Sequence, residues 1–394
     1  MIKDPRWVWQ RSEWPNFVYD SALLAPALAE AHWMHGMLEG KSQAIGFESF
    51  QQITFHAFVD EVISTAAIEG VRFPRELVHS SVERKLGLAS GRTVNRSVDG
   101  LVDVIDDAIT HSDQPLDADR LCRWQSALFP GEVSHTPKFV VGRFREGHER
   151  MRIVSNMHGR EVIHYEAPPS SEVPQEMERF LKWFDDTKPA ETQSQGLYVD
   201  GFARAAIAHL WFECIHPFED GNGRVGRAIV SMALAQCLRE STRLYSLSCQ
   251  LFIVRSEYYD ALNSAQRGDM DVSDWVKWFI SQSTKACAIA IKSADRAIEK
   301  RRFWERTQDC ALNKRQKRVL HLLLDAGVCV DADGLNAENY MCLTGASKAT
   351  ATRDLSALVN SGQLFTRGAG KARRYHLMLR VPETVEQREV APLI

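Results

Sequence analysis

The residues best suited to chemistry lie in one short stretch, residues 216–227, which reads HPFEDGNGRVGR. Its histidine, His216, is a candidate general base because imidazole titrates near neutral pH. Asp220 offers a hard carboxylate of the kind that binds Mg²⁺. Five further residues can donate hydrogen bonds to phosphate oxygens: Gly221, Asn222, Gly223, Arg224 and Arg227. Together these groups predict phosphoryl or nucleotidyl transfer, in which a protein mainly positions groups and neutralises charge.

The same stretch connects two helical patterns, residues 198–214 and residues 225–238. Proline and glycine separate the patterns, so the sequence predicts a loop that enters a helix N-terminus. Free backbone N–H groups and the positive end of the helix dipole make such a place an anion site. Arg224 and Arg227 lie at the unfavourable end of that dipole, which a bound polyanion would explain. The alternative is a glycine-rich turn with a capping aspartate and surface arginines.

A second mismatch between charge and helix dipole occurs at the end of the helical pattern of residues 47–69. Gly70 fits the residue that follows a helix, which places Glu69 in the last turn, where an anion is unfavourable. An ion pair between Glu69 and Arg227 would relieve both mismatches. The alternative is an ordinary surface glutamate near a helix end.

The HPFEDGNGRVGR stretch resembles the Fic motif, HPFx(D/E)GNGRxxR, and matches it at every specified position. Most members of the Fic family transfer AMP from ATP to a Ser, Thr or Tyr hydroxyl of a protein. The resemblance implies that His216 deprotonates this hydroxyl and that Asp220 holds Mg²⁺ at the α- and β-phosphates. It also implies that Asn222 and the loop N–H groups hold the α-phosphate, while Arg224 and Arg227 take the β- and γ-phosphates. Other members transfer UMP, phosphocholine or phosphate, and the target protein stays open, self-modification included.

The segment from Thr65 to Gly70 resembles a second motif of this family, (S/T)xxxE(G/N), which inhibits the enzyme. Its specified residues are Thr65, Glu69 and Gly70. In members that carry the motif before the catalytic core, the glutamate bonds the second motif arginine, here Arg227, and stops the ATP γ-phosphate from docking productively. The same glutamate supports removal of AMP in some members. The resemblance therefore implies an autoinhibited adenylyltransferase.

A β-hairpin is predicted inside this helical protein, because two apolar runs, residues 151–155 and 162–165, flank a turn at residues 156–159. The hairpin could be a structural decoration. In the Fic family a hairpin flap docks the target segment by main-chain pairing. The flap residues implied by the resemblance are Arg152, Ile153 and Val154.

Two side chains further along could contact a nucleotide base. Tyr259 and Gln266 are seven residues apart, so they share a helix face and could stack on adenine and hydrogen-bond to it. The alternative for Tyr259 is core packing. The run resembles the Fic segment YYxxLxxAN, whose second Tyr and Asn contact adenine, and Gln266 stands in place of that Asn.

The N-terminal region, residues 1–112, is predicted to be a helical domain that carries the inhibitory motif. It resembles the small domain that precedes the Fic core in one bacterial subgroup. Trp7 and Trp9 alternate as in a short strand. The alternative is that the aromatic residues here pack the start of the chain onto the body.

The C-terminal region is predicted to be a separate unit. After a closing core helix at residues 271–281, a basic linking helix is expected at residues 285–312. Residues 313–380 then show helix, helix and β-hairpin patterns that resemble a winged helix-turn-helix domain. Between residues 346 and 376 there are six Lys or Arg and one Asp, a basic face that could bind DNA phosphates. The alternative is a protein-interaction or dimerisation module. Residues 381–394 are predicted to be a flexible tail.

The predicted fold is therefore mainly α. It consists of the N-terminal helical domain, a Fic helical core with a β-hairpin flap at residues 113–284, the linking helix and the winged helix-turn-helix domain. The leading hypothesis is a protein adenylyltransferase that uses ATP and Mg²⁺ and acts on a protein partner. The second hypothesis is a DNA-binding regulator whose Fic core senses nucleotide or transfers another phosphate-containing group.

The composition of the chain indicates the general class of protein and its compartment. The 394 residues are 44% hydrophobic and 25% charged, as in an ordinary globular protein of two or three domains. A formal net charge of −3 gives no global sign of nucleic-acid or membrane binding. The eight cysteines lack a zinc-site spacing, which favours free thiols in a reducing compartment. With no long apolar run and no signal peptide, we expect a cytoplasmic protein that does not enter a membrane. The family resemblance also suggests a homodimer.

Overall fold

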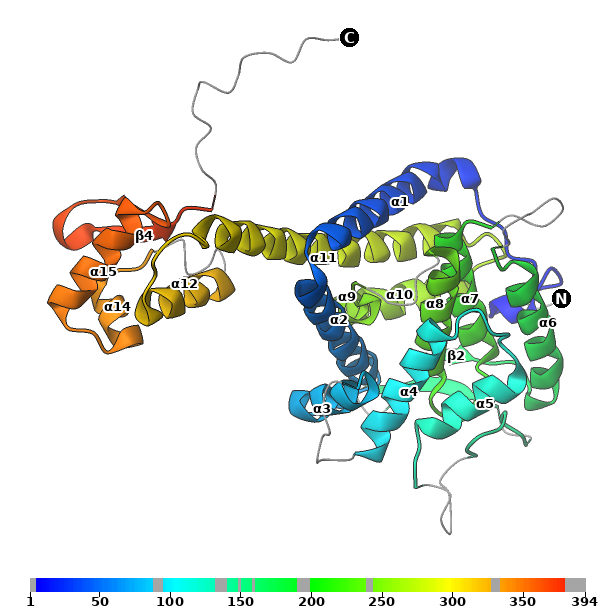
Figure 1. Cartoon of the computed structure of the whole chain (residues 1–394). Helices are drawn as coiled ribbons and strands as arrows, with labels where there is room; N and C mark the ends of the chain where they lie inside the picture. The colour runs from blue at the N-terminus through cyan, green and yellow to red at the C-terminus, as the bar shows by residue number, and fades with distance from the viewer. Residues whose placement is uncertain are drawn as a thin grey trace. The chain divides into compact units, whose positions relative to one another are not determined.

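The computed structural model describes residues 5–87, 95–131, 140–147, 150–157, 160–189, 199–238, 244–326 and 334–379. The chain forms two compact units, Met1–Ile291 and Lys292–Ile394, and helices dominate both, as predicted (Figure 1). Within the described ranges, no helix combines the length and the apolarity that crossing a bilayer requires. The predicted tail at residues 381–394 and the tip of the predicted hairpin turn, residues 158–159, lie outside the described residues.

The helices of the first unit are α1 (Ser21–Ala44), α2 (Phe47–Ile68), α3 (Arg75–Lys85), α4 (Arg96–Thr110), α5 (Ala118–Ala127), α6 (Val173–Asp186), α7 (Gly201–Ile215), α8 (Asn222–Leu238), α9 (Leu247–Ile253), α10 (Arg255–Arg267) and the start of α11 (Ser273–Thr307). Several begin at a side chain that accepts hydrogen bonds from the first free amides. Asp20, Asn95 and Asp117 have this role at α1, α4 and α5. Local capping therefore sets where these helices start.

Helices α7 and α8 pack against each other and form the centre of the first unit (Figure 1). Every residue of α7 is buried, because its sequence is apolar around most of the helix. Most of α8 is buried as well. The loop that joins the two helices, residues 216–221, is therefore held between two well-packed elements.

Helix α2 joins the N-terminal region to this centre by packing against α3, α4, α8 and α9. Val59, Val62 and Ala66 on α2 are completely buried. The helix ends with Glu69 as its C-cap residue, and Gly70 follows with φ +79°. That left-handed conformation is the one predicted for the glycine after a helix.

The strand considered for Trp7 and Trp9 is wrong. Residues Val8–Gln10 form a 3₁₀ turn instead, because the side chain of Gln10 accepts hydrogen bonds from the N–H groups of Arg6 and Trp7. Trp7 is buried, and the indole N–H of Trp9 donates to the carbonyl of Glu166 at 2.8 Å. The alternative interpretation, that these aromatic residues pack the start of the chain onto the body, agrees with the structure.

The predicted hairpin is formed by β1 (Arg152–Met157) and β2 (Arg160–Glu166), which pair antiparallel. The register shifts between Ile153 and Val154, as in a β-bulge. Near the end of β2, the buried hydroxyl of Tyr165 donates to the carbonyl of Cys214 at 2.6 Å. This bond fixes the base of the hairpin to α7.

The second unit contains the end of α11, then α12 (Lys314–Ala326), α14 (Ala337–Thr344), α15 (Lys348–Asn360), β3 (Leu364–Arg367) and β4 (Arg374–Leu377). Strands β3 and β4 pair antiparallel, and Leu335 forms a further antiparallel bridge with Tyr375. Its apolar core includes the buried side chains of Leu320, Tyr340 and Leu355. This unit therefore has its own apolar core.

The linking helix differs from the sequence-based expectation. A closing helix at residues 271–281 and a linking helix at residues 285–312 were predicted separately, whereas α11 is one continuous helix. Its last turns are more than a connector, because Phe303 is fully buried in the core of the second unit. Arg306 also donates to the carbonyls of Met378 and Leu379.

Gly100 lets α4 lie close to α5. A Cβ atom at this position would stand 1.8 Å from the carbonyl oxygen of Ala127. We expect Gly100→Ala to lower the free energy of unfolding by about 1–3 kcal/mol, because two backbones must move apart. Gly36→Ala in α1 is the control, since an added Cβ there meets nothing within 4 Å. The control should be neutral or stabilise by up to about 1 kcal/mol. Chemical denaturation measures both, and equal stabilities would contradict the close contact.

Candidate active site

His216 ends α7 in the left-handed conformation, with φ +50° and ψ +61°. This conformation costs a non-glycine residue about 1–3 kcal/mol, so the surroundings must hold it. The N–H of His216 donates to the carbonyl of Phe212 at 2.9 Å, and its own carbonyl accepts from Nε of Arg145 at 2.8 Å. Arg145 also donates to the carbonyls of Pro168 and Ile215. One buried arginine therefore fixes the turn from which the loop starts.

The imidazole of His216 is 12% exposed, and its Nδ1 lies 3.7 Å from Oε2 of Glu213. Nε2 is consequently on the side of the ring away from that carboxyl group. Burial, and after it the positive charge of Arg145, lower the pKa of His216 to about 4. The ring is therefore neutral at neutral pH and can accept a proton.

Asn222 holds the loop in shape. Its side-chain oxygen accepts from the N–H of Phe218 at 2.9 Å, and its side-chain nitrogen donates to the carbonyl of the same residue at 2.7 Å. The side-chain amide is engaged in these two bonds. The backbone N–H of Asn222 is therefore the group left for the phosphate contact that the family resemblance implies. Gly221 has φ +91°, and an added Cβ would stand 3.1 Å from the ring of Phe129. Both restrictions favour glycine at that position.

Asp220 presents a carboxylate that is 54% exposed. Its Oδ1 accepts from the N–H of Gly221 at 2.5 Å and lies 3.5 Å from Nη2 of Arg224. Within the described ranges, no group of three or more His, Cys, Asp or Glu side chains could hold a metal ion by itself. A lone exposed carboxylate beside an anion site fits Mg²⁺, which commonly combines one or two carboxylates with water and substrate phosphates.

Arg224 and Arg227 are only 8% and 3% exposed. Nε of Arg224 and Nη1 of Arg227 are buried and have no hydrogen-bond partner among the residues that the structure describes. The guanidinium of Arg224 lies over the ring of Phe129, 4.8 Å from its centroid. Buried cationic donors without an acceptor are costly, so an anionic ligand would satisfy both arginines.

The carboxylate of Glu69 lies on the first turn of α8. Nη2 of Arg227 donates to Oε1 of Glu69 at 2.8 Å, and that oxygen stands 2.1 Å from where a Cβ on Gly223 would be. Arg227 also donates to the hydroxyl and the carbonyl of Thr65, at 2.7 and 2.8 Å. Against the effect of burial, the charge of Glu69 raises the pKa of Arg227. An internal carboxylate thus stands where the sequence predicted an anion.

The two residues predicted to contact adenine have different surroundings. The hydroxyl of Tyr259 donates to the carbonyl of Ile68 at 3.1 Å, directly before Glu69. Gln266 is 1% exposed, and its side-chain nitrogen donates to the carbonyl of Glu213 at 3.4 Å. In this structure Gln266 contacts the backbone of α7 from inside the core and does not face solvent.

The predicted flap residues lie on β1. Arg152 donates to Oε2 of Glu166 across the hairpin at 2.9 Å, Ile153 is half-buried, and Val154 is 44% exposed. Among the described strands, β1 pairs only with β2, which leaves its other edge available for an added strand.

Glu213 is a residue of this site that the sequence analysis missed. It is buried one helical turn before His216, and its Oε1 would be 2.7 Å from a Cβ on Gly226. Burial, and after it the charge of Glu69, raise the pKa of Glu213 to about 8. The acid is therefore mostly protonated at neutral pH. Its spacing from His216 and its place in an apolar run were the available signals.

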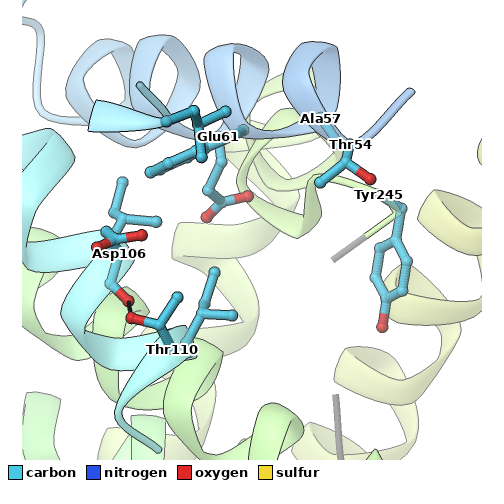
Figure 2. A pocket seen from close by; sticks show the side chains of 10 residues that line it. Thr54, Ala57, Glu61, Asp106, Thr110 and Tyr245 are labelled. Atoms are coloured by element: carbon cyan, nitrogen blue, oxygen red, sulfur yellow. Dashed lines mark hydrogen bonds between the residues drawn. The ribbon is translucent and has the colours of Figure 1, made fainter. Parts of the chain in front are cut away.

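A pocket between α2 and α4 is a separate feature. Figure 2 shows Thr54 and Glu61 of α2 across from Asp106 and Thr110 of α4, and no residue of the site described above lines this pocket. The carboxylate of Glu61 accepts hydrogen bonds from the residues that cap and begin α9, Ser246 and Ser248. The pocket is therefore lined mainly by helices of the N-terminal region, and Glu61 at its edge ties α2 to α9.

The loop, the two arginines, α7 and most of α8 fall within residues 115–234, which match the Fic/DOC family. The chain carries a Fic/DOC domain. A second match covers residues 7–88 and is to a domain of unknown function, DUF4172. Glu69 therefore reaches the Fic domain from the domain that precedes it.

Two relatives are similar to about a quarter of this chain. A probable protein adenylyltransferase of Aquifex aeolicus, aq_aa38, is 31% identical over 104 residues, which cover 26% of this chain and 27% of that protein. Protein adenylyltransferase fic-1 of Caenorhabditis elegans is 32% identical over 98 residues, which cover 25% of this chain and 17% of that protein. The chain thus spans less than a third of either relative.

The fold is also found in a solved structure. The crystal structure of a Fic family protein from Desulfovibrio desulfuricans matches with a TM-score of 0.52 at 18% identity, over 92% of this chain and 98% of that chain. At this identity the likeness shows the Fic fold alone.

The raised pKa of Glu213 gives a pH dependence of stability. The folded chain keeps this proton up to a pH of about 8, whereas the unfolded chain loses it near 4.5, so the stability contributed by this group falls as the pH rises between these values. We expect Glu213→Gln, which resembles the protonated acid, to match the wild-type Tm near pH 5 and to exceed it increasingly towards pH 8. Glu257→Gln, which alters an exposed carboxyl group of α10, is the control. A Tm difference that stays constant over this range would contradict the assignment.

Proposed function

We propose that this protein is a Mg²⁺-dependent adenylyltransferase, which transfers AMP from ATP to a hydroxyl group of a protein and is held in check by Glu69. The observation that carries the proposal is the carboxylate of Glu69 on the first turn of α8, bound by Arg227. It supports an anion site at this turn, close to His216, whose lowered pKa favours the neutral ring. The names of the two relatives support adenylyl transfer as the reaction.

In the proposed reaction His216 is the base. Nε2 takes the proton of the target hydroxyl, and the hydroxyl oxygen attacks the α-phosphorus of ATP. The bond between the α-phosphorus and the bridging oxygen breaks, and pyrophosphate leaves with its electron pair. Burial keeps the ring of His216 neutral, so Nε2 has a lone pair for this proton, and the negative charge of a bound triphosphate would raise the lowered pKa towards neutrality.

The remaining groups bind phosphates. The first N–H groups of α8 have no carbonyl partner within the helix and suit the α-phosphate. Arg224 and Arg227 supply the unpartnered donors for the β- and γ-phosphates. Mg²⁺ held by Asp220 would neutralise phosphate charge and orient the triphosphate. The open edge of β1 would align the target segment by main-chain pairing.

Glu69 would inhibit the transfer reaction because its carboxylate and the γ-phosphate both need Arg227 as their hydrogen-bond donor. A carboxylate on the first turn of α8 repels a triphosphate and keeps Nη2 of Arg227 engaged. ATP could then bind only after the pair opens, or with its phosphates displaced from the reactive geometry.

The proposal is tested with ATP labelled on its α-phosphate, in the presence of Mg²⁺. We expect Glu69→Gly to transfer about ten to a hundred times more label to protein than the wild type, because the lost charged hydrogen bond is worth about 1.5–3 kcal/mol. Label can appear on this chain or on a protein of the lysate. Glu69→Gly combined with His216→Ala should transfer none.

Glu48→Gly is the matched control, since it also removes a carboxylate from α2 but at the exposed start of the helix. It should behave as the wild type. If folded Glu69→Gly binds ATP and transfers no label, adenylyl transfer is refuted. If Glu48→Gly increases label transfer as strongly as Glu69→Gly, inhibition by Glu69 is refuted and the transfer reaction stands.

The metal requirement is tested in the Glu69→Gly background. We expect EDTA to abolish labelling, Mg²⁺ in excess to restore it, and Asp220→Asn to need a higher Mg²⁺ concentration, because an amide is a weaker ligand than a carboxylate. Glu219→Gln, which alters the neighbouring acid, should keep the original Mg²⁺ dependence. Full labelling in EDTA would contradict a role for the metal.

A further inference from the structure

The second unit has a feature that adenylyl transfer does not use, a pair of helices joined by a tight turn. α14 ends at Gly345, which has φ +68°, and α15 begins after Ser347, whose hydroxyl accepts from the N–H of Thr350. A turn of this length containing glycine is typical of a helix-turn-helix, in which the second helix enters the major groove of DNA. The β3–β4 hairpin follows directly.

The outward face of α15 is polar and carries positive charge. Its exposed hydrogen-bonding side chains are Lys348, Thr352, Arg353, Ser356 and Asn360. These are types that read base edges or contact phosphates. The face is otherwise formed by Ala349 and Ala357, whose small side chains permit a close approach.

The single acid of α15 is kept away from this face. Asp354 is buried and accepts from Nε of Arg315 at 2.9 Å, from the side-chain nitrogen of Asn313 at 3.0 Å and from the hydroxyl of Tyr340 at 3.0 Å. Its charge is therefore balanced inside the unit, and no carboxylate of α15 would oppose a polyanion.

The β3–β4 hairpin adds further positive charge. Arg367 at the end of β3 is exposed and lies over the ring of Phe365, and Arg373 is exposed just before β4. The hairpin and α15 are neighbours in the fold, because β3 packs against α15. A helix that faces a groove and an adjacent basic hairpin that meets the backbone would contact DNA at two places.

The same surface is poorly suited to a protein partner. Protein interfaces are centred on buried aromatic and other large apolar side chains. In the described part of this unit, the large apolar residues with exposed side chains are Leu322 on α12 and Leu343 on α14, and neither α15 nor the hairpin contributes one. Charge and composition therefore favour a nucleic acid.

We propose that the second unit is a winged helix-turn-helix domain that binds duplex DNA. Helix α15 would lie in the major groove with Lys348 and Arg353 on flanking phosphates, and the two exposed arginines of the β3–β4 hairpin would contact further phosphates. This proposal is independent of the proposed transfer reaction, because no residue of the Fic loop takes part. Phosphate contacts by cations release counterions, so binding must weaken steeply as salt rises.

The full-length protein is titrated into a short fluorescein-labelled DNA duplex of mixed sequence, and anisotropy is followed between about 50 and 200 mM salt. With four cations on phosphates, the slope of log K against log salt is expected to be about −3.6, which is a loss of about a hundredfold in affinity over this range. Lys348→Ala with Arg353→Ala should reduce the slope by about 1.8, and Arg367→Ala with Arg373→Ala by a similar amount.

Lys277→Ala with Lys285→Ala is the matched control, since it removes the same charge from exposed positions on α11 in the first unit. It should leave affinity and slope unchanged. Wild-type protein that fails to bind the duplex at the lowest salt overturns the proposal. So does a control pair that weakens binding as much as the α15 pair, because binding would then follow net charge and not this surface.

Discussion

The ion pair between Glu69 and Arg227 joins two helix ends that are each unfavourable alone. An acid ends α2 and arginines begin α8, so each charge opposes the dipole of its own helix. At 2.8 Å each charge balances the other. The contact also draws the C-terminal end of α2 onto the centre of the Fic domain, with Thr65 as a second anchor. The arrangement of the N-terminal region therefore depends on the same arginine that the proposed chemistry needs.

Burial sets the protonation of the groups around that pair. α7 excludes water along its whole length, so His216 stays neutral and Glu213 keeps its proton at neutral pH. The site interior therefore carries its positive charge mainly on the arginines. Such an interior attracts anions strongly, and it leaves the histidine able to accept a proton. The strained turn at His216 is tolerated because Arg145 bonds several carbonyls around it.

Local signals in the sequence were enough to predict the loop and the end of α2. They left the pairing of Glu69 with Arg227 as one of two alternatives, and the resemblance to the inhibitory motif favoured it. Capping residues, glycine positions and charges at helix ends all act within a few residues. Features set by tertiary packing were not predictable in this way. The side chain of Asn222 turns back onto Phe218, Gln266 points into the core, and α11 continues where two helices were expected. The winged helix-turn-helix and the roles of the flap residues remain predictions from pattern and resemblance.

Gly223 shows how little space separates the two domains at this point, since Oε1 of Glu69 takes the room that a side chain would need. A tethered carboxylate in that space is an intramolecular ligand, present at a high effective concentration. An anion that enters the turn must displace this carboxylate. Anion binding therefore weakens the docking of α2, and the docking of α2 lowers the affinity for the anion by the same factor. Any partner that holds α2 away from α8 would therefore tighten the proposed binding of a nucleotide without touching the nucleotide.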